Sequence, residues 1–425
     1  MYLFLIKKDE LKESLIMSPQ DLKESLEMRE VKEKHLEQFN DLMNYVFQIT
    51  NAEINEIGDK YLLNMKKPLL QACDVLGWFD KDKLVSQIMV YPFQVNIHGK
   101  LYKMGGLTGV GTYPEYAGKG LIHSLMKEML FRMKEKGQTL SYLYPYSIPY
   151  YRKKGWEIIS DVIDYRVKDT QIPKMSQVPG RTMRVVIDHP DKEQVYARFA
   201  RRTHGAMIRN ALAWDERFRW ERSDLSVAIY YNPEGQPTGY IYYKVEEETF
   251  FATEMIYLDE EARRGLWNFI RAHISMVYDV KGKIFTNEPL AFLLEDGEIE
   301  QKISPYYMGR IVDVQGFLEE FPFQRPVRTD PAIKEIVLHL KDPMLDWNND
   351  TFVLSWNDES RLTVTKESGR EDGLSMDIQT LTTMMLSYRR PAYLKKVERI
   401  KGPVEMVNWL ERLIPNEQPW HADYF

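Results

Sequence analysis

Apolar and polar positions alternate in blocks that predict short strands and amphipathic helices in a mixed order. Helical spacing covers residues 30–66, and strand patterns follow at 75–79, 84–90 and 93–97. The segment 105–123 then has the pattern of a strand, a glycine-bearing loop and the first turn of a helix. Strands and helices in this order predict an α+β fold.

The helix that begins at Leu121 carries one apolar stripe at helical period. Its apolar positions are Leu121, Ile122, Leu125, Met126, Met129, Leu130 and Met133. Glu128 and Arg132 are spaced as an ion pair one turn apart, and Gly137 is placed to end the helix. A strand at 140–144 completes a unit of strand, loop, helix and strand.

The same kind of pattern begins again after a linker, PKMSQVPG, at 173–180. The second block has strand patterns at 184–187, 227–231, 238–246 and 254–258, and helical patterns at 192–202 and after residue 259. A third block begins near Met308, with helices at 314–320, 380–388 and 404–412 and strands at 336–340, 351–356, 361–366 and 374–378.

These blocks predict three domains, which agrees with a chain of 425 residues. A charged segment precedes them, in which residues 9–17 nearly repeat as 20–28 with an offset that keeps both copies on similar helical faces. The predicted parts are a helical arm at 1–28 and domains at 29–175, 181–303 and 304–425.

Composition places the chain among water-soluble globular proteins. It is 44% hydrophobic and 28% charged, and no apolar run approaches the ~20 residues that cross a bilayer. The N-terminal MYLFLI is followed at once by charged residues, which is too short for a signal peptide. Cys73 is the single cysteine, so no intrachain disulfide can form, and a cytoplasmic location is expected.

Charge and motif content exclude several function classes. A net charge of −6 argues against a nucleic-acid binder. The eight histidines are scattered without an HExxH motif, so no metal site is expected. No GxSxG motif is present, which removes the support for serine hydrolase chemistry.

The loop before Leu121 has the residues of a phosphate cradle. Glycines leave backbone N–H groups accessible, and the N-terminus of a helix carries a partial positive charge. A P-loop would have Ser or Thr after Lys119, where this chain has Gly120, and a dinucleotide fingerprint would have a third glycine in place of His123. A chance glycine-rich turn before a core helix is the alternative interpretation.

The loop sequence PEYAGKGL resembles the acetyl-CoA loop of the GNAT N-acetyltransferase superfamily. The second block has YLDEEARRGL at the matching place, with acidic Asp259, Glu260 and Glu261 where a diphosphate would approach. Like charges disfavour phosphate there. The second block is therefore predicted to be a degenerate copy that does not bind acetyl-CoA.

A tyrosine-rich segment follows the predicted strand at 140–144. YLYPYSIPYY holds five tyrosines in ten residues, and Tyr151 is followed at the right spacing by Gly155 and Trp156. This resembles the element that closes the acetyl-CoA site of GNAT proteins. A phenol with a pKa of about 10 is protonated at neutral pH and can donate a proton to a leaving thiolate. Tyr142 and Tyr144 are expected to pack at the edge of a core.

The three-block plan, with MGRIVD opening the third block, resembles the enhanced intracellular survival (Eis) acetyltransferase family over about residues 29–425. The resemblance implies tandem GNAT folds, the second degenerate, and a C-terminal α/β domain like a sterol carrier protein. It also implies a C-terminus that threads back into the active site. The family tends to form large homo-oligomers, typically hexamers.

The resemblance also implies roles for individual residues. Tyr151 would be the general acid, and Phe425 would supply its terminal carboxylate as general base. The implied acetyl-CoA contacts are Val110, Gly111 and Thr112 for the pantetheine arm, Gly118, Lys119, Gly120, Leu121, Ile122 and His123 for the diphosphate, and Tyr146 and Ser147 on the far side.

The sequence departs from the family pattern in the loop and in the tail, and a terminal carboxylate requires burial to act as a base. Ala117 and Gly118 stand where the loop usually has arginine, which predicts weaker pairing to phosphate, and Tyr424 stands where an acidic residue can occur. A free α-carboxylate has a pKa near ~3.5, which burial would raise. The tail contains Pro419, Trp420, Tyr424 and Phe425, and such an apolar end is expected to be buried.

The predicted function is acetyl transfer from acetyl-CoA to a primary amine by direct attack, without a metal or a covalent intermediate. Aminoglycosides, polyamines or lysine side chains are the acceptors that the resemblance implies. Trp78, Phe79 and Tyr91 could line an acceptor pocket, and Asp74 or Asp423 could meet an ammonium group, although each is also an ordinary core or surface residue. The alternatives are a catalytically silent acyl-CoA sensor and a lipid carrier.

Overall fold

The computed structural model describes residues 26–50, 52–54, 58–217, 224–285, 287–324, 335–357 and 361–425. The chain divides into two compact units, each considered by itself. Unit 1 comprises the described residues up to Pro92 together with Gly105–Gly137, and unit 2 comprises Phe93–Met104 and the described residues from Gln138 onward.

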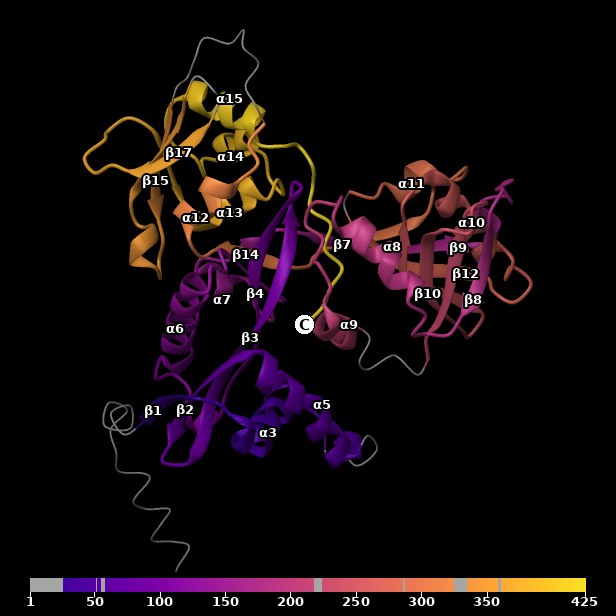
Figure 1. Cartoon of the computed structure of the whole chain (residues 1–425), viewed down its shortest axis with the longest axis horizontal. Helices are drawn as coiled ribbons and strands as arrows, with labels where there is room; N and C mark the ends of the chain where they lie inside the picture. Colours follow the sequence, from indigo (N-terminus) through magenta and orange to yellow (C-terminus); the bar gives the residue numbers. More distant parts are fainter. Residues whose placement is uncertain are drawn as a thin grey trace, which may run out of the picture. The chain divides into compact units, whose positions relative to one another are not determined.

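Unit 1 combines antiparallel strands with helices (Figure 1). Its elements are β1 (Leu26–Glu30), α3 (Leu36–Val46), α5 (Asp59–Ala72), β2 (Asp74–Asp80) and α6 (Leu121–Glu135), with parts of β3 (Lys83–Ile97) and β4 (Lys100–Thr112). Strand β1 pairs with β2, and β2 pairs with β3, both antiparallel. The apolar stripe of α6 is buried, and Gly105 of β4 lets the sheet approach it, because a β-carbon there would lie 2.7 Å from Cε of Met133.

Two element predictions in this region are wrong. Residues 26–28, the end of the predicted helical arm, lie in strand β1, where Leu26 faces the core and Met28 pairs with Trp78; the rest of the arm lies outside the described residues. The strands predicted at 84–90 and 93–97 form one strand, β3. Tyr91 and Phe93 are buried and Pro92 between them is exposed, so the strand passes through the proline, whose fixed φ is compatible with an extended strand.

Unit 2 contains a second sheet in the order β13-β7-β12-β11-β10-β9-β8. Its strands are β7 (Asp161–Lys168), β8 (Arg181–Val185), β9 (Ser226–Tyr231), β10 (Pro237–Glu246), β11 (Thr249–Tyr257), β12 (Asp279–Phe285) and β13 (Glu300–Pro305). Helices α8 (Asp191–Ala200) and α10 (Glu260–Arg271) contribute Val195, Tyr196, Leu266 and Trp267 to its cores.

Two strands of unit 2 pair with partners that lie far from them in the sequence. Strand β7 follows β5 (Leu140–Leu143) and β6 (Glu157–Ile158), yet it pairs with β12 and β13. Strand β14 (Met308–Ile311) comes after the second sheet, yet it pairs with both β5 and β6. The predicted domain boundaries at 175 and 304 stay predictions. Strand β7 lies before residue 175 but pairs with strands after it, and β14 lies after residue 304 but pairs with strands before it.

The C-terminal part of unit 2 has a sheet in the order β17-β16-β15-β18 with four helices around it. The strands are β15 (Glu335–Lys341), β16 (Thr351–Trp356), β17 (Leu362–Lys366) and β18 (Leu374–Asp377), and the helices are α12 (Val314–Glu320), α13 (Ile378–Met385), α14 (Pro391–Lys396) and α15 (Val404–Leu413). No described helix has the length and apolar character needed to pass through a bilayer.

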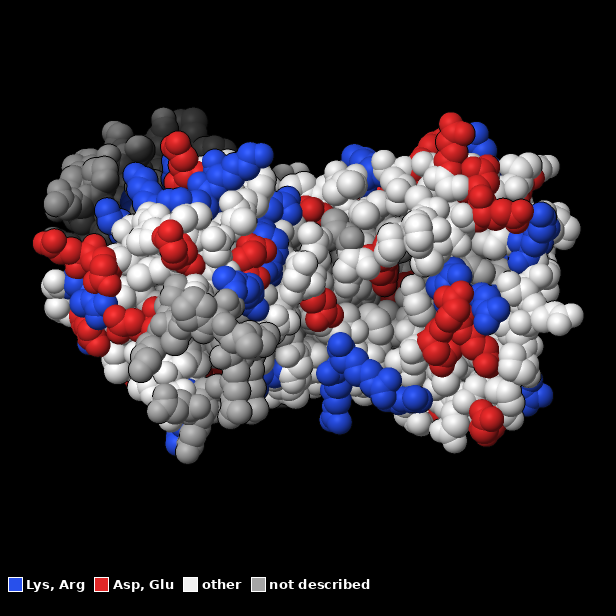
Figure 2. Space-filling model, turned by 90° about the horizontal axis from the view of Figure 1, so that it is seen from above, with Lys and Arg blue, Asp and Glu red and all other residues white. Residues whose placement is uncertain are grey.

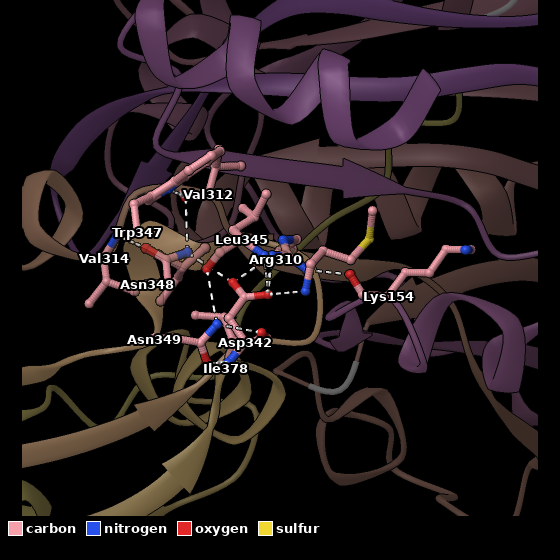
Figure 3. Close-up of polar contacts among 12 residues, drawn as sticks. Lys154, Arg310, Val312, Val314, Asp342, Leu345, Trp347, Asn348, Asn349 and Ile378 are labelled. Carbon is pink, nitrogen blue, oxygen red and sulfur yellow. Dashed lines mark hydrogen bonds and ion pairs between the residues drawn. The ribbon is translucent and has the colours of Figure 1, made fainter. Parts of the chain in front are cut away.

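The MGRIVD segment at 308–313, which includes β14, contacts this C-terminal part through buried polar groups (Figure 3). The guanidinium of Arg310 donates to both carboxylate oxygens of Asp342 at 2.6 Å and to the carbonyl of Lys154. Asn348 donates to Asp342 at 2.9 Å and to the carbonyl of Val312 at 3.1 Å. Both charged side chains are fully buried, so each depends on the other for its charge compensation.

Candidate functional site

The loop before α6 leaves the N-terminus of this helix uncapped by any side chain. Gly118 and Gly120 have φ of +77° and +75°, a conformation that favours glycine, and a β-carbon at either would meet nothing within 4 Å. The first turn of α6 has no acidic residue. An anion can therefore approach the backbone N–H groups of this turn from open space.

Strand β4 leads into the loop with a local irregularity at Gly109, whose φ is +60°. Gly111 is packed against Val46, which a β-carbon would approach to 2.9 Å. The hydroxyl of Ser86 lies 2.7 Å from that of Thr112 and donates to the carbonyl of Gly111 at 3.2 Å. Val110, Gly111 and Thr112 thus form a fixed strand end directly before the loop.

Lys119 is the one Lys or Arg in the loop sequence PEYAGKGL, and its ammonium group already has partners. Its Nζ donates to the carbonyl of Glu115 at 3.4 Å and lies 5.0 Å from the centre of the Tyr116 ring. Leu121 is buried, Ile122 is half-buried and His123 is exposed in the first turn of α6.

The matching helix of the second sheet, α10, is capped by its own side chain. Asp259 accepts a hydrogen bond from the backbone N–H of Ala262 at 2.8 Å. Glu260 pairs with Arg263, and Glu261 accepts from the hydroxyl of Tyr230 at 2.7 Å. A carboxylate therefore occupies the position that α6 leaves open for an anion.

Tyr151 lies in unit 2 on the short helix α7 (Ile148–Arg152), which follows Tyr146 and Ser147 directly. Its side chain is 4% exposed, and its ring contacts those of Tyr146, Tyr150 and Trp156. Burial raises the pKa of Tyr151, and the neighbouring Tyr150 and Tyr146 raise it further. The phenol therefore stays protonated at neutral pH and can act as a proton donor.

The C-terminal residue also lies in unit 2, with its aromatic side chain buried. Phe425 is 9% exposed, and its ring packs against Phe93 and Tyr307 at centroid distances of 5.2 and 5.3 Å. Its backbone N–H donates to the hydroxyl of Tyr307 at 3.0 Å. The expectation of a buried apolar tail is met at Pro419, Trp420 and Phe425, and it is wrong at Tyr424, which is 51% exposed.

The tail reaches this position along the second sheet's domain. The backbone N–H of Trp420 donates to the carbonyl of His204 at 2.8 Å, and its indole N–H donates to Glu288 at 3.1 Å. Gly205 has φ of +83°, and a β-carbon there would lie 2.8 Å from the nitrogen of Trp420. The tail is held by contacts along its length, with no helix or strand of its own.

Exposed tyrosines surround the last residues of the chain. Tyr144 and Tyr424 are about half exposed, and their rings meet at 5.1 Å. Tyr144 also contacts Tyr306 and Tyr307. Sequence reasoning missed Tyr307, although an aromatic doublet directly before MGRIVD was a signal that it could have used.

The residues considered for an acceptor pocket have other partners. Phe79 and Tyr91 are buried in the core, and the indole N–H of Trp78 donates to the carbonyl of Leu121. Asp74 pairs with Lys136, and Asp423 pairs with buried Arg209 at 2.6 Å. Each carboxylate therefore already has a cation of this chain as its partner.

Among the described residues, no group of histidine, cysteine and carboxylate side chains is arranged to hold a metal ion. Figure 2 shows Lys and Arg side chains interspersed with Asp and Glu on one face of the molecule.

The chain is similar to known families over each of its three parts. Models of the acetyltransferase (GNAT) domain match residues 27–159 and 205–311, and a sterol carrier protein domain model matches residues 314–422. These matches confirm the predicted α+β class, with two GNAT folds and a C-terminal domain like a sterol carrier protein. No significant match was found among curated protein sequences.

Solved structures match nearly the whole chain. One from Enterococcus faecalis, described as a conserved protein of unknown function and probable N-acyltransferase, is 31% identical with a TM-score of 0.84, covering 94% of this chain and 99% of its own. A GCN5-related N-acetyltransferase from Anabaena variabilis is 22% identical, with a TM-score of 0.77 and coverage of 94% and 100%. Eis1 from Mycobacterium abscessus is 17% identical, with a TM-score of 0.78 and the same coverage.

Proposed function

The chain belongs to the Eis-like family of GNAT N-acetyltransferases, and we propose that it transfers the acetyl group of acetyl-CoA to a primary amine. The GNAT fold is a scaffold for acyl transfer from acetyl-CoA. The proposed acceptors are aminoglycosides and related polyamines, or lysine side chains, and the proposed assembly is a homohexamer in the cytoplasm.

The first GNAT fold is the proposed binding site for the cosubstrate. The open N-terminus of α6, with Gly118 and Gly120, fits a diphosphate, and Lys119, Leu121, Ile122 and His123 complete that turn. The end of β4 at Val110, Gly111 and Thr112 would pair with the pantetheine arm, and Tyr146 and Ser147 would line the other side. Bound acetyl-CoA supplies the acetyl group as a thioester.

Two groups of this chain carry the proposed proton transfers. The terminal carboxylate of Phe425 accepts a proton from the amine as its nitrogen forms a bond to the acetyl carbon. Tyr151 gives its phenolic proton to the sulfur as the carbon–sulfur bond breaks. Its protonated state at neutral pH follows from its burial. The products are an acetylated amine and free thiol, and no metal is needed.

The single observation that carries this proposal is the buried end of the chain. An α-carboxylate at an ordinary terminus lies in water, where it is a poor base. Here Phe425 is buried against Phe93 and Tyr307, in the same unit as Tyr151.

Release of free thiol from acetyl-CoA with a panel of amines tests the proposal. The panel contains an aminoglycoside, a linear polyamine and a lysine peptide, each with the natural chain, with Tyr151→Phe and with two glycines added after Phe425. We expect turnover with at least one amine, a loss of about 100-fold in Tyr151→Phe and no turnover in the extended chain. Full activity of the extended chain would exclude the carboxylate as base.

A catalytically silent acyl-CoA sensor is the second candidate. It is favoured by the engagement of Lys119 with Glu115 and Tyr116, which leaves the loop without an arginine or a lysine held outward. Binding of acetyl-CoA without thiol release for any amine would support the sensor.

A further inference from the structure

The degenerate second GNAT domain contains a buried charge network that includes a residue of the C-terminal tail. Arg209, between α8 and α9 (Ala211–Arg217), donates two hydrogen bonds to the carboxylate of Glu254 on β11, at 2.9 and 2.6 Å. Its Nε donates to Asp423 at 2.6 Å. The side chains of all three residues are at most 3% exposed.

Aromatic residues complete this network. The hydroxyl of Tyr196 lies 3.1 Å from the second carboxylate oxygen of Asp423, and the guanidinium of Arg209 lies 3.8 Å from the centre of the same ring. Tyr240 donates to Glu254 at 2.6 Å. Burial alone would raise the pKa of Glu254, but Arg209 and Arg217 outweigh it and lower the pKa to about 2. Glu254 therefore stays charged at neutral pH.

Asp423 lies two residues before the end of the chain, so this network fixes the tail close to its terminal carboxylate. Tyr307 fixes the next point, because its hydroxyl accepts the backbone N–H of Phe425 at 3.0 Å. Tyr306 provides a further contact directly before Asp423, with its hydroxyl 3.4 Å from the carbonyl of Ala422. A chain end tied at these points has little freedom to move its carboxylate.

The orientation of the Arg209 guanidinium explains why it pairs with one particular residue of the tail, Asp423. The bidentate contact to Glu254 fixes the plane of the guanidinium, and Nε then points to one place, which the tail fills with Asp423. A buried carboxylate is tolerated only where such a partner is present. The tail cannot shift along its path without leaving Asp423 or Arg209 incompletely paired.

We propose that Asp423 is a positioning residue, and that the Arg209–Asp423 pair is the means by which the degenerate domain holds the terminal carboxylate of Phe425 in place for catalysis. The positional role rests on the proposed function, whereas the anchoring of the chain end does not. The second domain thus acts on the reaction of the first without binding a cosubstrate itself.

Digestion with carboxypeptidase A tests the anchor without reference to activity. The enzyme releases a C-terminal phenylalanine only when the chain end leaves its site, and mass spectrometry follows the loss of Phe425. We expect Asp423→Asn to accelerate this release at least tenfold in the full-length folded protein. The matched control is Asp279→Asn, which removes the same charge from a pair with Arg166 in the same sheet, remote from the tail in sequence and contacts. Release at the natural rate in Asp423→Asn would overturn the anchor.

Steady-state kinetics test the positional role. For Asp423→Asn we expect kcat for the best amine to fall by about 10- to 100-fold, with KM for acetyl-CoA within twofold of the natural value. In a chain that lacks Phe425, Tyr424 carries the α-carboxylate one residue short of its natural place, so the same substitution should cause no further loss. A merely structural role would lower activity in both backgrounds.

Each remaining outcome also decides the matter. Faster release of Phe425 with an unchanged kcat would overturn the positional role. If Asp423→Asn does not fold, judged by circular dichroism, Tyr307→Phe replaces it, since this change removes only the hydroxyl that accepts from Phe425, and the same results are expected. If the natural chain acetylates no amine, the proposed function fails and carboxypeptidase release alone decides the anchor.

Discussion

Arg310 occupies the space beside Gly155 in which any other residue would place its β-carbon. Gly155 also has φ of +94°, and its neighbour Lys154 gives its carbonyl to the same guanidinium (Figure 3). The glycine of the Tyr151 element is therefore required by an arginine more than 150 residues later in the sequence. A motif associated with the cosubstrate site is thus also a contact with the C-terminal part of the chain.

Gly155→Ala should be far more destabilising than an alanine at another glycine of positive φ. An alanine held at positive φ lowers the free energy of unfolding by about 1–2 kcal/mol. Displacing the guanidinium of Arg310 from buried Asp342 brings the total loss to about 3 kcal/mol or more. Gly235→Ala is the control, because Gly235 has φ of +76° and a β-carbon there would meet nothing within 4 Å. Urea unfolding measures both, and equal losses would contradict this account.

A carboxylate placed at the N-terminus of α6 should weaken binding of acetyl-CoA. Gly120→Asp puts at this position the charge that Asp259 already provides at α10. Gly120→Asn is the matched control, since both side chains tolerate positive φ and only one is charged. We expect Asp to raise the dissociation constant about tenfold above that of Asn, measured by calorimetry. Equal constants would mean that the phosphates bind elsewhere.

Tyr142→Phe should leave the protein as stable as before or more stable, by up to about 1 kcal/mol. The Tyr142 side chain is buried, and its hydroxyl has no hydrogen-bond partner in the described structure, so its removal relieves a desolvated polar group. Tyr240→Phe should do the opposite, by about 1–3 kcal/mol, because it removes the donor to Glu254. Thermal unfolding of both variants decides whether the two hydroxyls differ in this way.

Glu288 should make stability depend on pH between about 4.3 and 7. Burial raises its pKa to about 7 in the folded protein, although Trp420 and the backbone of Phe285 lower it. Between these values the folded state keeps a proton that the unfolded state has lost, so stability falls as pH rises. Relative to Glu288→Gln, the natural chain should lose on the order of 2 kcal/mol from pH 5 to pH 8. Parallel melting curves over this range would exclude the effect.

The sequence alone predicted correctly those features that depend on residues close to one another in the chain. The stripe from Leu121 to Met133, the stop at Gly137 and the Glu128–Arg132 pair all occur as predicted, because each depends on residues within a few helical turns. The strand predictions at 227–231 and 238–246 were also close to β9 and β10, since both strands are rich in the β-branched and aromatic residues that favour strands. The roles assigned to Tyr151, Phe425 and the loop residues stay predictions.

Long-range relationships could not be predicted in this way. Nothing in the neighbourhood of Arg209 or Asp423 shows that the two charges meet, because 214 positions separate them. Asp423 was considered as a ligand for an ammonium group because the sequence shows a carboxylate near the end of the chain. The sequence does not show that Arg209 is its partner. Strand β3 was predicted as two strands, 84–90 and 93–97, and the burial of Tyr91 and Phe93 on either side of Pro92 accompanies one continuous strand.

The position of β14 between β5 and β6 limits how far the chain can be truncated from its C-terminus. A fragment that ends at residue 175 would contain the loop, α6 and Tyr151, yet it would leave unpaired edges on β5 and β6 and keep β7 without its partners β12 and β13. Such edges invite pairing between molecules. The sheet that contains β5 and β6 is therefore completed only after residue 311 has been synthesised.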